Sequence, residues 1–142
     1  MQKYLNKVSG PLLDRIDLHV EVTPVAFAEL SAVGKGEPSS AIRERVIKAR
    51  EIQTARYKDV PGMYANAQMS SKQLREICVI NQAGEALLKR AMERLNLSAR
   101  AYDRILKVSR TIADLAGAAD IKAEHLAEAI QYRSLDREGW AG

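Results

Sequence analysis

The chain has few of the residues from which disulfide frameworks and metal sites are built. Its 142 residues include one cysteine, Cys78, and two histidines, His19 and His125. A single cysteine excludes an internal disulfide framework and is typical of a reducing compartment. The histidines are far apart and neither lies near a second ligand at metal-binding spacing, so we interpret both as structural. We expect Cys78 to be a buried, unreactive thiol, and His19 to point outward from a strand.

Aromatic residues and long apolar runs are also scarce. The chain has one Phe and one Trp, although 46% of its residues are hydrophobic and 28% are charged. This composition predicts a globular domain with a core of Leu, Ile, Val and Ala. No apolar run reaches about 18 residues and no signal peptide is evident, so we expect no contact with a membrane and a cytoplasmic location.

A phosphate-binding loop is missing as well. Such a loop has the pattern G-x-x-x-x-G-K-S/T, in which backbone N–H groups hold the phosphates of a nucleotide. The one Gly-Lys pair, Gly34-Lys35, is followed by Gly36 and lacks the earlier glycine, and there is no strand of four apolar residues ending in an Asp that would hold Mg²⁺. We therefore predict that this chain alone holds no cofactor, binds ATP weakly if at all, and does not hydrolyse it.

What the sequence does contain is mostly helical. The pattern predicts an all-α domain of four to five helices over residues 39–142, with a frayed C-terminus, after a linker around Gly34–Pro38. Before the linker, Asp17–Val22 alternates polar and apolar residues and predicts one strand without a partner. The expected helices run from a cap at Ser39 or Ser40 to about Tyr57, from Ser70 or Ser71 past Ile77, from Asn81 to Leu95, from Ser98 to Gly117 with Tyr102 facing inward, and from Ala123 to Leu135.

Two arrangements are open for the first 35 residues or so. A single strand cannot satisfy its own backbone, which favours a mobile segment. Alternatively, the apolar residues of this segment lie back on the helices as an irregular arm. We expect mobility, because the helical domain has enough apolar stripes to fold without the arm.

Basic side chains gather on one face of the helix that begins at Ser98. At about 100° per residue, Arg100, Arg104, Lys107 and Thr111 lie within about 60° of one another. Arg100 is in the first turn, where a cation is unfavourable for the helix but suitable for binding a phosphate. A solvated basic face and a phosphate site are both consistent with this pattern.

Arg15 lies between two acids, Asp14 and Asp17, immediately before the expected strand. One interpretation is a surface arginine in a local cluster of ion pairs. The other is an arginine finger, a guanidinium that stabilises the charge developing on the γ-phosphate bound by a neighbouring subunit.

Four segments of the chain carry a resemblance to a known family. They are Gly10–Val20, Asn66–Met69, Ser98–Leu115 and His125–Arg133. These segments resemble the magnesium-chelatase-like AAA+ ATPases, in their competence-associated branch. The resemblance extends from Tyr4 to about Arg137, and Gly10–Val20 and Ser98–Leu115 are its long and specific segments. Lys122 departs from the family, which usually has a Ser or Thr cap before the last helix.

The resemblance implies that residues 39–142 are the lid of an AAA+ ATPase, and that residues 1–38 are the end of its α/β core. It implies that Arg15 is an arginine finger acting in trans, and that Arg100 is the sensor-2 residue that contacts the nucleotide, with Arg104 as the alternative. ATP and Mg²⁺ would then be bound by an upstream core in the larger protein. The family further implies a homo-hexamer that remodels a substrate, which is branched DNA in the competence-associated members and a porphyrin receiving Mg²⁺ in the chelatases.

A different class of function is also consistent with the sequence. The net charge is +4, and the segment Ile42–Lys58 is rich in Arg and Lys, as in a stand-alone helical module that binds nucleic acid. No aromatic residues are interleaved with these basic residues, and no helix-turn-helix spacing is clear. A DNA titration at several salt concentrations separates the two functions, because direct binding requires a steep salt dependence.

Overall fold

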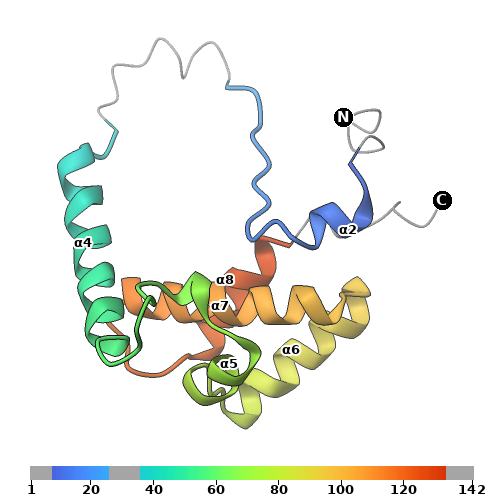
Figure 1. Ribbon diagram of the computed structural model, residues 1–142. Helices are drawn as coiled ribbons and strands as arrows, with labels where there is room; N and C mark the ends of the chain where they lie inside the picture. Colours follow the sequence, from blue (N-terminus) through green and yellow to red (C-terminus); the bar gives the residue numbers. More distant parts are fainter. Residues whose placement is uncertain (1–7, 26–35, 134–142) are drawn as a thin grey trace.

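The protein is seen here as a computed structural model that describes residues 8–25 and 36–133 (Figure 1). We call residues 8–25 the N-terminal arm and residues 36–133 the helical domain. The arm contains only the short helix α2 (Gly10–Leu13). The helical domain contains α4 (Ser39–Arg56), the 3₁₀ turn η1 (Asn66–Gln68), α5 (Ser71–Ile77), α6 (Gln82–Leu95), α7 (Ala99–Leu115) and α8 (Ala123–Gln131). The prediction of an all-α domain is therefore confirmed.

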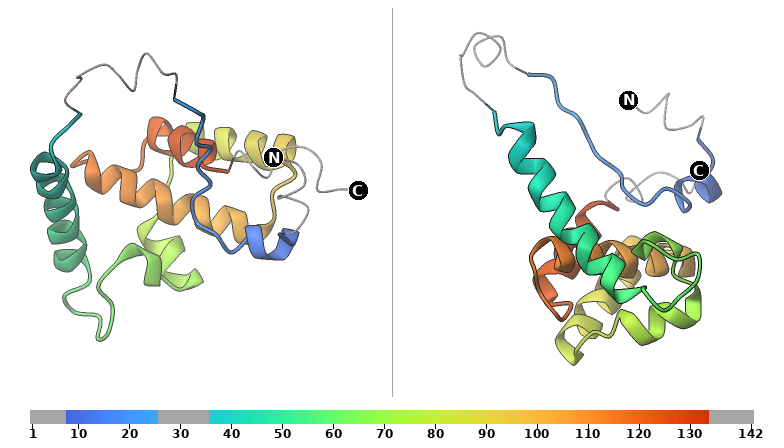
Figure 2. Two further views of the ribbon diagram at one scale, coloured as in Figure 1. Left: turned by 90° about the horizontal axis from the view of Figure 1, so that it is seen from above. Right: turned by 60° about the vertical axis from the view of Figure 1, so that its left-hand side comes forward.

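Helix α7 is the centre of the domain. It packs against α8, α4, α5 and η1, and α8 also packs against α6 (Figure 2). Ile105 and Ala113 of α7 and Leu126 of α8 are almost completely buried, together with Leu88 of α6. These small aliphatic side chains form one continuous core, in agreement with the composition.

Side-chain caps set most of the helix starts where the sequence predicts them. The side chains of Ser70, Asn81 and Ser98 each accept a hydrogen bond from the backbone N–H of the third residue of α5, α6 and α7, respectively. The predicted cap of α4 at Ser39 or Ser40 is wrong, because the N-cap is Pro38 and it makes no side-chain bond. Gly117 has a φ of 65° after the end of α7, which explains a glycine there.

The predicted strand at Asp17–Val22 does not form. In the described part of the chain the one β-type contact is a parallel bridge between Ile80 and Ile121, and Leu18–Val25 is irregular. A strand needs a neighbour for its backbone, and none of the described segments lies alongside it. The predicted direction of His19 is also wrong: His19 is buried, while Leu18 and Val20 are exposed.

Part of the arm nevertheless contacts the helical domain, although most of its apolar side chains are exposed. Leu13 and His19 are buried, and the His19 N–H donates to the carbonyl oxygen of Tyr132 at 2.8 Å. How mobile the arm is in solution stays a prediction, and residues 1–7 and 26–35 lie outside the described residues. The final helix ends at Gln131 rather than near Leu135, and the expected frayed end also lies outside the described residues.

The apolar stripe of α4 is only partly covered. Ala49 and Gln53 are buried against the rest of the domain, whereas Ile42 and Val46, on the same face, are exposed. The N-terminal half of α4 extends beyond the other helices (Figures 1 and 2). Tyr102, which was predicted to face inward, is 39% exposed.

Candidate functional site

Arg15 lies at the exposed tip of a short turn after α2. The backbone N–H groups of Arg15 and Ile16 donate to the carbonyl oxygens of Leu12 and Leu13, both at 3.0 Å. The acids beside Arg15 do not pair with it. Asp17 forms an ion pair with Arg104, and Asp14 lies 4.0 Å from Arg133. Within the described residues Arg15 makes no ion pair, so its guanidinium faces solvent.

Arg100 is the exposed cation at the start of α7. The hydroxyl of Ser98 accepts from the Ala101 N–H at 3.2 Å and fixes the first turn of the helix. Arg100 lies within this turn, is exposed, and has no ion-pair partner in the described part of the chain. A guanidinium and free N–H groups at one helix end form a suitable binding place for a phosphate oxygen.

Arg104, one turn further along α7, is engaged differently. Its Nη1 lies 2.8 Å from Oδ1 of Asp17 in the N-terminal arm. The predicted basic face is thus divided, since Arg100 has no ion-pair partner among the described residues whereas Arg104 pairs with Asp17 of the arm. Further along the same face, Lys107 Nζ donates to the carbonyl oxygen of Ala67 at 2.9 Å.

A buried polar network on the other half of α7 was not foreseen from the sequence. Its centre is the carboxylate of Asp114, which accepts from Arg56 Nη1 at 2.7 Å and from Asn66 Nδ2 at 2.8 Å. Arg110 Nε donates to the same carboxylate at 3.2 Å, and the Tyr57 hydroxyl donates to Asn66 Oδ1 at 2.7 Å. The network joins α4, η1 and α7 through side chains that are far apart in the sequence.

Electrostatics keep Asp114 ionised inside this network. Burial raises the pKa of the Asp114 carboxyl, but hydrogen bonds from Arg56 and Asn66, together with the charges of Arg56 and Arg110, leave the pKa below its ordinary value. The hydrogen bond to Asp114 in turn raises the pKa of Arg56. Arg110 also donates to the carbonyl oxygens of Ala118 and Ala119 and so closes the end of α7. The spacing of Arg110 and Asp114, four residues apart in one helix, was the local signal for this pair.

The histidines have structural positions in the described part of the chain. His125 is buried, and its Nδ1 accepts from the Lys122 N–H at 3.0 Å. His125 thus satisfies the backbone N–H of Lys122, the residue before α8, whereas a Ser or Thr at position 122 would accept from an N–H of the helix itself. Among the residues that the structure describes, no three His, Cys, Asp or Glu side chains are grouped as metal ligands.

None of the described helices is long and apolar enough to cross a membrane.

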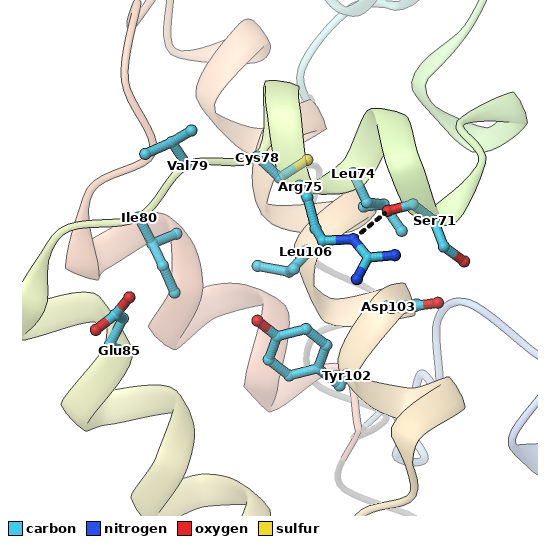
Figure 3. Close-up of a pocket in the computed structure, with 10 residues that line it drawn as sticks. All are labelled: Ser71, Leu74, Arg75, Cys78, Val79, Ile80, Glu85, Tyr102, Asp103 and Leu106. Atoms are coloured by element: carbon cyan, nitrogen blue, oxygen red, sulfur yellow. Dashed lines mark hydrogen bonds between the residues drawn. The ribbon is translucent and has the colours of Figure 1, made fainter.

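A half-open groove of about 490 Å³ lies between α5, α6 and α7 (Figure 3). Arg75 and Tyr102 project into it from α5 and α7, and Arg75 Nε donates to the Ser71 carbonyl oxygen at 3.3 Å. Cys78 also lines the groove and is buried, as predicted. Burial raises the pKa of the Cys78 thiol to about 11, so the thiol is protonated and unreactive at neutral pH.

Comparison with protein families identifies the chain. Residues 36–133 match the family described as magnesium chelatase, subunit ChlI C-terminal. This chain belongs to the magnesium chelatase family. Residues 1–30 match a second description of that family, magnesium chelatase subunit ChlI. The helical domain is thus a magnesium chelatase C-terminal domain.

Curated relatives agree with this assignment. The chain is 46% identical over 138 residues to the competence protein ComM of Haemophilus influenzae, covering 96% of this chain and 26% of the relative. It is 40% identical over 136 residues to the uncharacterized protein YifB of Escherichia coli, covering 95% of this chain and 26% of the relative. The chain therefore spans about a quarter of the length of these relatives.

Proposed function

We propose that this chain is the lid and sensor-2 region of an ATP-hydrolysing motor of the magnesium chelatase family. The observation that carries the proposal is the pair of exposed arginines, Arg15 and Arg100, without ion-pair partners in the described part of the chain. Arg100 is at the start of a capped helix, where a phosphate is favoured. Arg15 is at the tip of a turn, where a second molecule can reach it.

In this proposal, ATP and Mg²⁺ are bound by an upstream core of the larger protein. Mg²⁺ would neutralise charge on the phosphates, and its ligands would come from that core, since the described residues contain no grouped ligands. Arg100 would contact the γ-phosphate bound by its own subunit, and Arg104 is the less suitable candidate because it is paired with Asp17. Arg15 would reach the nucleotide of the neighbouring subunit in a homo-hexamer.

The proposed work of this motor is the remodelling of DNA, in the cytoplasm. The similarity to a competence protein supports DNA over a porphyrin as the substrate. The name of the family supports metal chelation as the alternative. ATPase assays of the full-length protein with branched DNA, linear DNA or a porphyrin distinguish DNA remodelling from metal chelation, because the true substrate is expected to stimulate ATP turnover.

The arginine assignments are tested in the full-length protein by Arg100→Ala and Arg15→Ala. We expect each substitution to reduce ATP hydrolysis about a hundredfold or more, because each removes charge stabilisation in the transition state. Arg90→Ala, an exposed arginine on α6, is the matched control and is expected to keep normal turnover. In mixed hexamers, subunits that retain Arg15 should restore hydrolysis by neighbours that lack it. Normal turnover of Arg15→Ala hexamers would show that the finger assignment is wrong.

A second function is favoured by one feature, the exposed basic residues of α4. Arg43, Lys48 and Arg50 are all exposed on this helix. A stand-alone nucleic-acid module would bind DNA through this helix at micromolar or lower Kd, with affinity falling steeply as salt rises. Titration of this chain with duplex DNA at about 50 and 200 mM salt tests this second function.

A further inference from the structure

We infer that Arg104 and Arg133 are positioning residues that dock the turn carrying Arg15 on the lid of the same subunit. We call residues 13–19 the Arg15 turn. The role of the docked turn in hydrolysis rests on the proposed function, whereas the docking itself does not.

Arg133 holds the turn on both sides of Arg15. It follows α8, is only 1% exposed, and its Nη1 donates to the carbonyl oxygen of Ile16. Its Nη2 lies 4.0 Å from Oδ1 of Asp14. A buried guanidinium is costly unless its N–H groups are bonded, so the burial of Arg133 favours the state in which the turn is in place.

Arg104 holds the turn from α7. Its Nη1 is 2.8 Å from Oδ1 of Asp17, two residues after Arg15. Arg104 and Arg100 are four residues apart and therefore lie on one face of α7. The helix that carries the proposed sensor-2 residue is thus directly connected to the turn that carries the proposed finger.

Contacts at His19 close the turn. The backbone N–H of His19 donates to the Tyr132 carbonyl oxygen at 2.8 Å, and the ring nitrogen Nε2 of His19 lies 3.3 Å from the carbonyl oxygen of Leu13. The Leu13 side chain is itself buried. Both ends of the turn are therefore fixed, while Arg15 at its tip is exposed, an arrangement that preorganises a cation for a second molecule.

The consequence is a coupling between two nucleotide sites. Arg100 and Arg15 belong to one connected unit, so a movement of the lid on its own nucleotide changes the position of Arg15 at the neighbour's nucleotide. Such a rigid-body movement needs two fixed connections, and Arg104–Asp17 and Arg133–Ile16 provide them.

The docking is tested first on this chain without nucleotide, by amide exchange at His19. Arg104→Asp and Asp17→Arg each place two like charges next to each other. We expect each to speed exchange of the His19 backbone amide about two- to five-fold, because the ion pair that they remove is partly exposed. The double variant Arg104→Asp/Asp17→Arg should restore protection. Arg90→Asp, the same charge reversal on α6, should leave the His19 amide unchanged. Unchanged exchange in both single variants, or no recovery in the double variant, would overturn the docking role of Arg104.

Arg133 is tested by Arg133→Met, which keeps much of the length and removes the donors. We expect a larger increase in His19 exchange than for Arg104→Asp, at least about tenfold, because a buried donor is lost. Exchange at Ile105 and Leu88 should stay slow, which shows that the domain remains folded. An unchanged His19 amide in a folded variant would overturn the docking role of Arg133.

The consequence for hydrolysis is tested in full-length hexamers. Arg104→Asp is expected to lower kcat with little change in KM for ATP, and the double variant with Asp17→Arg should recover kcat. A direct contact of Arg104 with the nucleotide would not give this recovery, because the double variant carries Asp at position 104. If Arg15→Ala keeps normal turnover, the proposed function fails while the exchange results stand. If Arg15→Ala abolishes turnover but the Arg104 variants show normal exchange and kcat, the positioning role fails while the proposed function stands.

Discussion

The helical domain and the N-terminal arm are held in place by different kinds of contact. In the domain, α7 packs against several other helices. Its contacts are of two kinds: buried Leu, Ile and Ala side chains, and the buried ionic network around Asp114. In the arm, Leu13 and His19 are buried, but most of the remaining apolar side chains are exposed, among them Leu12, Ile16, Leu18, Val20 and Val22. The stabilising contacts are thus concentrated in the helical domain, and the exposed Arg15 lies outside that domain, in the arm.

This difference has a physical cause. The helices of the domain satisfy their own backbone groups and need only side-chain packing to assemble. The arm has the alternation of a strand without a neighbouring strand, so its backbone is satisfied at a few points, such as the His19–Tyr132 bond. Four measurements test this contrast, beginning with the one expected to be largest.

Removal of the central carboxylate should destabilise the domain strongly. For Asp114→Ala we expect the free energy of unfolding to fall by about 3–5 kcal/mol, because Arg56 and Arg110 are left without their buried counter-charge. Denaturant unfolding of this chain measures the change. Asp120→Ala, at an exposed acid, is the control and should stay within about 0.5 kcal/mol. A loss of less than about 1 kcal/mol for Asp114→Ala would show that the network does not hold the domain together.

Acid should weaken the same network more gently, because a protonated carboxyl still accepts hydrogen bonds. The pKa of Asp114 is lowered in the folded state, so the unfolded chain binds its proton first as the pH falls. The stabilisation by Asp114 is therefore complete above the ordinary Asp pKa of about 3.9 and is lost as the pH falls through the lowered folded value. Urea unfolding between pH 7 and pH 2 measures it. The curve for Asp114→Asn should be flatter over this range, and equal slopes for the two proteins would contradict the assignment.

Truncation of the arm's buried anchor should affect the arm but not the domain. For Leu13→Ala we expect exchange of the His19 amide to speed up about tenfold or more, with less than about 1 kcal/mol lost from global unfolding. Leu126→Ala, at a fully buried core position, is the matched control and should cost about 2–5 kcal/mol.

The same exchange data test the predicted mobility of the arm. Amides of Leu18–Val22 should exchange faster than those of Ile105–Ile112. Equal protection of the two segments, or a global loss of about 2–5 kcal/mol for Leu13→Ala, would mean that arm and domain unfold as one unit.

The smallest expected effect on stability is at the two proposed nucleotide contacts. Arg15→Ala and Arg100→Ala should each change the free energy of unfolding by no more than about 0.5 kcal/mol, because both side chains are exposed and unpaired in the described part of the chain. Thermal or denaturant unfolding of this chain provides the measurement. A loss above about 1 kcal/mol at either position would indicate a structural role in place of a functional one.

Features that depend on neighbouring residues were predictable from the sequence alone. The order of the helices α4 to α8, the caps at Ser70, Asn81 and Ser98, and the burial of Cys78 all follow from local spacing and local hydrogen bonds. The exposure of Arg100 also follows, because it lies opposite the apolar stripe of its helix. The resemblance to the family was likewise found from runs of consecutive residues.

Features that join distant residues were decided by the tertiary structure. Arg56 and Asp114 are 58 residues apart, and Arg133 and Ile16 are 117 apart, so no spacing rule connects them. The same applies to the pairing of Arg104 with Asp17, and to the burial of His19 where a strand would have turned it outward. A buried charge needs its partner at hydrogen-bonding distance, and only the packing of α4, α7 and the N-terminal arm determines which partner that is.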